Sequence, residues 1–334
     1  MKRLLLAGAF LPLLIAQAPR VGIVDFYGLR KIPAERILKA IAVKEGEPLP
    51  GSKGALEDLL ERFPGVVRSR VEAVCCESGD AILFIGIEEK GAPHFAPRTA
   101  PAGEARLPDE VVDTWRRFTE ALESAARTGR SAEDWTRGHS LLADPEARGL
   151  QEGFAVFAEL NPRLVRSVLR TSSDAEHRAI AAYVMGYAPT KRLVTDDLQY
   201  ALQDPESAVR QNALSALGAI AVLASRDPDL DIRVTPTWFT EMLHSIVLSD
   251  RTRAVMALLI LTEQRSEKVL GPIRERAIGA LVEMARWKSL KHAVGPFTLV
   301  GRLAELSDSE IESAWERGDR ESVIAKALNA RRRR

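Results

Sequence analysis

A nine-residue pattern occurs twice in the second half of the chain and most limits what the chain can fold into. Residues 178–186 read RAIAAYVMG and residues 210–218 read RQNALSALG, so arginine, alanine, a long apolar residue and glycine recur in the same order. Looser versions begin at Arg251 and Arg274. The apolar residues follow one helix face, and short helices cannot bury such a face alone. The pattern therefore predicts helices that stack as a repeat array.

The clearest unit spans residues 204–218, DPESAVRQNALSALG. Asp204 is a favoured N-cap residue, and Pro205 suits the first helical position. Small and apolar side chains behind them form the predicted buried face, and Gly218 marks a close contact or a bend. We assign structural roles to the matching positions of both copies, which are Asp204, Pro205, Arg210, Ala213, Leu217, Gly218, Arg178 and Gly186.

This unit resembles a HEAT repeat, of the short kind also found in bilin-lyase-like proteins. Its Asp-Pro, Val-Arg and Ala-Leu-Gly elements stand where that family has them, and residues 174–186 share some of them. The resemblance implies an α-solenoid over about residues 140–330, in which Asp and Arg side chains bridge neighbouring repeats. Asp204 and Arg210 suit that role.

The N-terminal part has a different sequence pattern, in which β-branched segments typical of strands occur together with short segments typical of helices. Proline and glycine pairs separate the segments. The predicted order is β-α-α-β-β, and the whole fold class is α+β followed by all-α. The predicted segments are residues 21–28 (strand), 33–41 and 52–63 (helices), and 67–76 and 81–89 (strands).

This order resembles a polypeptide-transport-associated domain, called POTRA, over about residues 20–90. The resemblance implies a periplasmic domain that binds other proteins without catalysis, often through an exposed sheet edge. Domains of this family commonly serve outer-membrane assembly, secretion or division. The landmarks, in order, are Phe26-Tyr27-Gly28, Gly46, Leu59-Leu60, Phe63-Pro64-Gly65-Val66 and Ile87-Glu88.

The segment 67–76 alternates between small or apolar residues and charged ones, which predicts a half-buried strand. Its apolar face holds Val67, Val71, Ala73 and Cys75. Its charged face holds Arg68, Arg70 and Glu72, which we take as candidate protein-binding residues. Trp238 is a further candidate because it follows an acidic loop, although Thr235-Pro236 before it is also a common helix start.

Cys75 and Cys76 are the two cysteines of the chain, and they are adjacent. In an oxidising compartment they could be free thiols, a vicinal disulfide or part of an intermolecular bond. The specific geometry that a disulfide requires favours two unlinked residues on opposite faces of a strand.

The first 18 residues have the pattern of an export signal. Lys2 and Arg3 precede a short apolar run, and Ala16-Gln17-Ala18 has the form of a signal-peptidase site. Pro19 is a poor residue after a cleavage site, so cleavage after Ala16 and retention as a membrane anchor both stay open. We expect an exported protein, either periplasmic or associated with a membrane through this segment.

Residues 91–108, GAPHFAPRTAPAGEARLP, are rich in proline and alanine. Proline denies this segment helix and ladder hydrogen bonds, which predicts an extended, semi-rigid spacer. It joins the POTRA-like domain to a helical domain at 109–330, and a basic tail follows at 331–334. Within the helical domain, further helix starts are predicted at Ser131 or Asp134, at Pro145 and at Pro162.

The chain holds 47 basic and 46 acidic residues, so it has no net attraction for nucleic acid. Its five histidines lack zinc spacing, and nucleophile elbows and phosphate-binding loops are missing. We therefore predict no catalytic residue, cofactor or metal. The resulting hypothesis is a non-catalytic cell-envelope adaptor that binds other envelope proteins. The alternatives are a membrane-tethered division or envelope-assembly component and, as a lesser one, a lyase-like HEAT-repeat enzyme.

Overall fold

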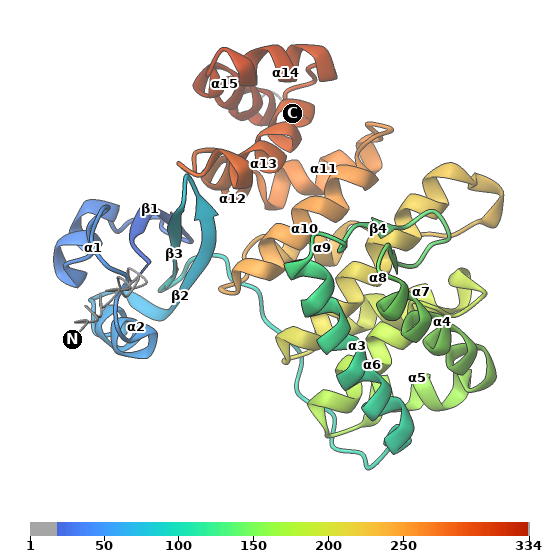
Figure 1. Ribbon diagram of the computed structural model, residues 1–334. Coiled ribbons are helices and arrows are strands. Elements are labelled where there is room, and N and C mark those ends of the chain that lie inside the picture. The colour runs from blue at the N-terminus through green and yellow to red at the C-terminus, as the bar shows by residue number, and fades with distance from the viewer. Residues whose placement is uncertain (1–18, 333–334) are drawn as a thin grey trace, which may run out of the picture.

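The computed structural model describes residues 19–332 of the chain (Figure 1). The predicted export signal at residues 1–18 lies outside the described residues, as do the last two arginines of the basic tail. The described chain forms a small sheet with two helices, followed by a long array of helices.

The N-terminal sheet has three strands in the order β1-β3-β2. β1 runs parallel to the central strand β3, and β2 runs antiparallel to it. The order along the chain is the predicted β-α-α-β-β. The elements are β1 (Val21–Tyr27), α1 (Ala34–Ile41), α2 (Lys53–Glu61), β2 (Val66–Glu77) and β3 (Asp80–Glu89).

The central strand β3 is buried on both faces, which explains its continuous apolar sequence. On one face, Leu83, Ile85 and Ile87 pack with the apolar residues of α1 and α2. On the other face, Ile82 and Phe84 belong to the core of the helical array. The sheet is therefore enclosed between its own two helices and the array.

The predicted apolar face of β2 is wrong except at Val71, which is buried. Val67 is 51% exposed, and Ala73 and Cys75 are also exposed. The reason is length, because the 9-residue helix α2 lies against the middle of a 12-residue strand. The two cysteines sit at an irregularity in the β2–β3 register, and a disulfide joins them, which favours the alternative over the two unlinked residues expected.

The rest of the chain is helical apart from one short hairpin. Helices α6, α8, α10 and α13 pack side by side in a row, and the helices between them form a second layer. The elements are α3 (Asp109–Arg127), β4 (Glu133–Asp134), β5 (Leu141–Leu142), α4 (Pro145–Leu160), α5 (Pro162–Thr171), α6 (Ala175–Met185), α7 (Lys191–Ala201), α8 (Ser207–Arg226), the 3-10 helix η1 (Pro228–Leu230), α9 (Thr237–Met242), α10 (Leu248–Leu261), α11 (Glu267–Arg276), α12 (Ile278–Ala285), α13 (Leu290–Leu303), α14 (Asp308–Glu316) and α15 (Arg320–Arg332).

The predicted helix start at Ser131 or Asp134 is wrong, whereas helices do begin at Pro145 and Pro162. Strand β4 pairs with β5 in a hairpin instead. The Trp135 ring lies over Gly218 of α8, 3.3 Å from where a Cβ would stand. The packing of Trp135 on Gly218, which is distant in sequence, outweighs the local preference of Ser131 and Asp134 for a helix N-cap.

The sheet packs directly on the helical array. The Tyr27 hydroxyl donates to the Ile246 carbonyl at 2.9 Å, and the Trp287 indole donates to the Phe26 carbonyl at 2.8 Å. The Asp25 carboxylate accepts the backbone N–H groups of Lys288 and Ser289 at 2.8 and 3.0 Å. These bonds join segments more than 200 residues apart and fix the sheet against the array.

The segment 91–108, called the linker below, is extended as predicted, but it is not a spacer. Its backbone bonds the loops that precede three helices of the row, through Phe95 to His244, Arg98 to Gln203 and Gly103 to Thr171. Phe95 and Leu107 are buried in the core of the array. Proline prevents a sheet but leaves these N–H groups free to bond an irregular edge.

We expect Asp25→Ala to lower the free energy of unfolding by about 2–3 kcal/mol, because the buried N–H of Ser289 and the partly buried N–H of Lys288 lose their acceptor. Urea denaturation measures the change. Lys288→Ala is the matched control, since it keeps the backbone N–H that bonds Asp25 and removes only the exposed ion pair with Glu45, which contributes about 0.5 kcal/mol. Equal losses in the two variants would contradict the packing of the sheet on the array.

Candidate protein-interaction surfaces

Three arginines occupy equivalent positions in the row of helices, and together they are called the arginine row. Arg178, Arg210 and Arg251 each stand four residues after the N-cap of α6, α8 and α10. All three are at least 96% buried. A buried guanidinium needs hydrogen-bond acceptors for its N–H groups, so each arginine requires acceptor groups at fixed places around it.

Each arginine first bonds the loop before its own helix. Arg178 donates to the carbonyls of Ser172 and Ser173 at 2.9 and 3.1 Å. Arg210 donates to those of Asp204 and Pro205 at 2.7 and 2.9 Å. Arg251 Nε donates to the carbonyl of Ser245 at 2.6 Å. The carbonyls six residues before each arginine are therefore satisfied in the same way.

Each arginine then reaches a carboxylate of the following repeat. Arg178 forms a bidentate pair with Asp204, with both bonds at 2.9 Å. Arg210 pairs with Asp250 at 2.7 and 3.0 Å. Both bonds of Arg210 end on Oδ2 of Asp250, whereas Arg178 bonds both oxygens of Asp204, an arrangement that fixes orientation as well as distance. The arginine row thus fixes the orientation of each repeat relative to the next.

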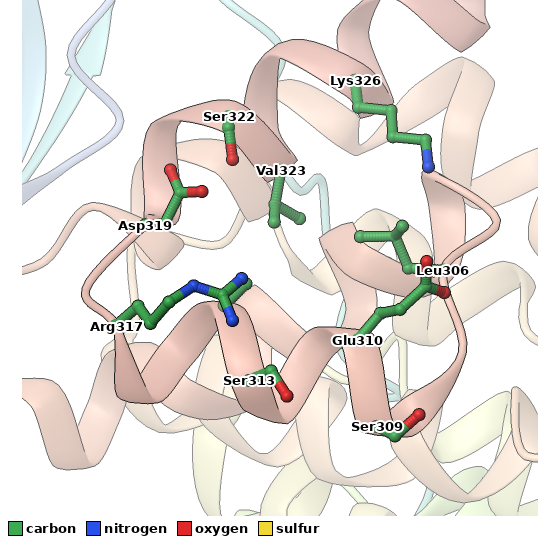
Figure 2. Close-up of a pocket in the computed structure, with 10 residues that line it drawn as sticks. Leu306, Ser309, Glu310, Ser313, Arg317, Asp319, Ser322, Val323 and Lys326 are labelled. Carbon is green, nitrogen blue, oxygen red and sulfur yellow. The ribbon is translucent and has the colours of Figure 1, made fainter.

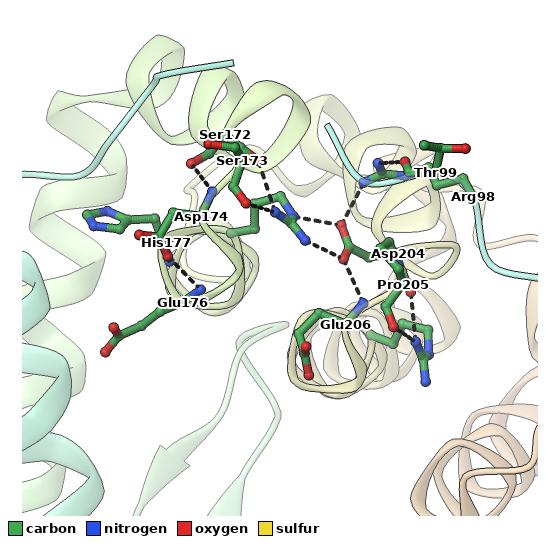
Figure 3. Close-up of polar contacts among 12 residues, drawn as sticks. Arg98, Thr99, Ser172, Ser173, Asp174, Glu176, His177, Asp204, Pro205 and Glu206 are labelled. Carbon is green, nitrogen blue, oxygen red and sulfur yellow. Dashed lines mark hydrogen bonds and ion pairs between the residues drawn. The ribbon is translucent and has the colours of Figure 1, made fainter. Parts of the chain in front are cut away.

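The predicted helix start at Asp204 and Pro205 is wrong, because α8 begins at Ser207 with Glu206 as its N-cap. The Asp204 carboxylate lies between two guanidiniums, Arg178 and Arg98, and it also accepts the Glu206 N–H at 3.0 Å (Figure 3). Arg210 contacts the backbone of Asp204, while its ion pair is with Asp250.

The third member of the arginine row has a looser partner. Arg251 Nη1 lies 3.8 Å from Glu283 Oε2. Burial raises the pKa of Glu283, and Arg251 and Arg30 oppose that shift. In the next repeat, Ala293 stands four residues after the N-cap of α13, so the arginine row ends there. Arg274, a predicted repeat position, instead bonds Glu267 within α11.

The sheet and the linker cover the arginine row along its length. Arg98 of the linker bonds Asp204 at 2.8 Å (Figure 3). The Phe95 ring lies 5.5 Å from the Arg210 guanidinium, and the Tyr27 ring lies 4.8 Å from that of Arg251. These are cation–π distances. The arginine row is therefore an internal structure and not a surface open to a partner.

The remaining predicted repeat positions lie in the packing between helices. Ala213 and Leu217 are fully buried, and Gly218 lies under the Trp135 ring. A Cβ on Gly186 would stand 2.8 Å from Ala216 Cβ, so glycine permits the close approach of α6 and α8. Trp238 is half-buried against the same core.

The outer edge of β2 is the part of the sheet that another strand could reach. The N–H groups of Ser69 and Val71 point away from β3 and bond carboxylates of α2, Glu61 at 3.0 Å and Glu57 at 2.7 Å. By strand alternation, the backbone of Ala73 points the same way, beyond these two carboxylates. Part of the edge is therefore protected, and part is open.

The three charged residues predicted on β2 have different surroundings. Arg68 is exposed and pairs with Glu88 at 3.3 Å, and Arg70 is exposed. The Glu72 carboxylate accepts the Leu248 N–H at 3.3 Å and so faces the helical array. Arg68 and Arg70 stay candidates for partner contact, whereas Glu72 has an internal partner.

One polar cluster lies beneath the hairpin, where sequence reasoning expected none. The Lys191 ammonium donates to the Gly186 carbonyl at 2.6 Å and lies 3.2 Å from His139 Nδ1. Burial lowers the pKa of Lys191 to about 8. Burial, with Lys191 and Arg137 adding repulsion, lowers the pKa of His139 to about 4. The adjoining cavity is about 20 Å³, which leaves space for a water but not for a substrate.

A groove of about 520 Å³ lies between α14 and α15 (Figure 2). It is lined by serines and by charges of both signs, such as Glu310, Asp319 and Lys326. Glu310 is already bonded to Ser307 in a capping box. The groove therefore presents no convergent set of catalytic groups.

Within residues 19–332, no three His, Cys, Asp or Glu side chains form a group that could bind a metal ion. Over the same residues, α8 alone is long and apolar enough to cross a membrane by length and composition. Of its apolar 18-residue window, 56% is buried within the structure.

Arg178→Ala should lower the free energy of unfolding by about 3–5 kcal/mol, because it leaves Asp204 buried with one partner fewer. Arg98→Ala should cost about 1–2 kcal/mol, since the bidentate pair survives. The control is Arg233→Ala, whose exposed pair contributes at most about 0.5 kcal/mol. Urea denaturation of the three variants gives the order, and a loss from Arg178→Ala no larger than the control would refute the role of the arginine row.

His139→Gln should reduce the loss of stability on acidification. His139 has a pKa of about 4 when folded and about 6.5 when unfolded. The unfolded state therefore binds the extra proton between these values, and stability falls as pH drops from 6.5 to 4. Relative to pH 8, the variant should lose about 1–2 kcal/mol less at pH 4, after allowance for partial exposure. Parallel curves of unfolding free energy against pH would contradict the buried neutral imidazole.

Comparison with known proteins supports the repeat architecture. Residues 162–258 match the HEAT repeats family. No curated protein matches the chain. Among solved structures, a designed armadillo repeat protein is 14% identical and aligns over 55% of this chain and 93% of its own, with a TM-score of 0.33. The family match and the row of packed helices identify this part of the chain as a helical repeat solenoid, a fold that presents extended surfaces to protein partners.

Proposed function

We propose that the protein is an exported, non-catalytic adaptor of the cell envelope. In this proposal its POTRA-like sheet binds a strand of one envelope protein, and its solenoid binds another partner. The observation that carries the proposal is the outer edge of β2, where the backbone beyond Val71 faces outward and the side chain of Ala73 is exposed. Main-chain groups in this arrangement accept an added strand.

The carboxylates of α2 would make the edge of β2 selective in which strands it binds. Glu57 and Glu61 bond the N–H groups of Val71 and Ser69, so they occupy positions that an incoming strand would need. Such protection limits indiscriminate pairing between copies of the protein. The open part of the edge is short, which favours a partner that adds side-chain contacts with the exposed Arg68 and Arg70.

Export is supported by the basic and apolar pattern of residues 1–18. A disulfide between Cys75 and Cys76 agrees with an oxidising compartment. Retention of the N-terminal segment would make the protein a membrane-tethered division or envelope-assembly component. Pro19 after the cleavage site favours this alternative, and the mass of the mature N-terminus distinguishes the two. The lyase-like enzyme is the weakest reading, because the cavity beside Lys191 has no space for a substrate.

The test is photo-crosslinking in living cells of the native source, with a photoreactive phenylalanine placed on β2. The exposed positions Val67 and Ala73 share one face, and Arg68 and Arg70 share the other. An added strand should give adducts from Ala73 to one defined envelope protein. The strand β3 is unsuitable for this purpose because it is paired on both sides.

A proline substitution tests the backbone directly. Ala73→Pro removes an outward N–H and leaves the bonds to β3 intact, so it should abolish the adducts formed from Arg70 and Val67. Ala73→Val is the matched control, since it keeps the N–H. Adducts that survive Ala73→Pro, or that come only from Trp238, would assign partner binding to the solenoid and disprove edge docking.

A further inference from the structure

We propose a second protein-binding site, a pocket between α4, α5 and α7 that takes one large apolar side chain from an acidic, amphipathic segment of a partner. The proposal does not depend on the sheet edge. It rests on the proposed function only in taking the solenoid as a surface that binds protein.

The pocket has a volume of about 230 Å³ and a mainly apolar lining. Its floor consists of buried residues from three successive helices and the turn after α6. These residues are Ala158, Val165, Met185 and Ala188. Pockets of this kind bind a single anchoring side chain, which is how a small number of residues dominates many protein interfaces.

Two exposed leucines stand beside the pocket. Leu193 lines its rim and is 67% exposed, and Leu160 lies between the lining residues Ala158 and Pro162 and is 73% exposed. These are the two most exposed large apolar side chains of the described residues. Val156, one turn before Leu160 on α4, is 58% exposed. Apolar residues gathered around a concavity mark an interaction site, whereas scattered ones do not.

The charge at the rim determines the kind of partner. Arg163 and Arg166 line the pocket. Asp197, its one acidic lining residue, is 1% exposed and already bonds Arg166 and Arg170. Arg163 is exposed and forms no ion pair within the described residues. The rim is therefore net positive, and carboxylates that flank an apolar anchor fit it.

The sheet and the linker do not close this site. The linker bonds Thr171, His177, Gln203 and His244, and none of these lines the pocket. In Figure 1, α4, α5 and α7 lie on the side of the solenoid away from the sheet. A partner at the pocket and a strand at β2 would therefore not exclude each other.

The experiment selects peptides of 16 residues from a random displayed library against residues 19–334. Fluorescence anisotropy of synthetic copies then measures their affinity. We expect enrichment of Asp and Glu around one Leu, Ile or Phe. Leu193→Ser should weaken binding about tenfold, through lost apolar contact. Arg163→Glu should weaken it about fivefold, through repulsion of the carboxylates.

Charge exchange makes the test specific. A peptide with lysines in place of its glutamates should bind Arg163→Glu better than the parent protein. Leu290→Ser and Arg117→Glu are the matched controls, because both residues are exposed elsewhere on the solenoid, and each should change affinity less than about twofold.

Three results would overturn the proposal. The first is a selection that yields no peptide whose binding depends on Leu193. The second is a selection that yields basic or uncharged peptides. The third is a dimer of the chain that Leu193→Ser dissociates, which would make a second copy of the chain the occupant of the pocket. The Ala73→Pro variant should bind the selected peptides with unchanged affinity. Failure of edge docking and failure of this pocket are therefore separate outcomes.

Discussion

The buried arginine four residues after the N-cap is the interaction on which the rest of the structure depends. Its guanidinium bonds the loop before its own helix and a carboxylate of the next repeat, so a single side chain satisfies one repeat and orients the following one. A buried charge tolerates little error in geometry, because an unsatisfied one costs several kcal/mol. The regular row of α6, α8 and α10 follows from repeating that constraint.

The sheet and the linker pack onto this row. Burying three guanidiniums requires that their outer sides also be covered, and the covering groups come from Arg98, Phe95 and Tyr27. The sheet supplies the last of these and joins its own apolar strand face to the solenoid core. One face of the sheet therefore belongs to the core of the solenoid, while its other face forms a separate core with α1 and α2.

Local signals predicted the helices and strands well, because capping residues, glycines and apolar spacing act within a few residues of each other. They gave the order β-α-α-β-β and the helix starts at Pro145 and Pro162. The partners of the arginines were not predictable, since Asp250 lies 40 residues from Arg210 and no pattern links them. The docking of the linker was missed for the same reason. Proline content reports which hydrogen bonds a segment cannot form, but not which surface it will bury against.

The linker bonds the loops before three successive repeats along a single edge of the solenoid. In a helical solenoid, small rotations between neighbouring repeats add up along the array and set its curvature. Hydrogen bonds from one segment to three repeats restrain the rotations between these repeats along the bonded edge. The linker therefore limits how far these three repeats can rotate against one another, and with it how far the curvature of this part of the solenoid can change.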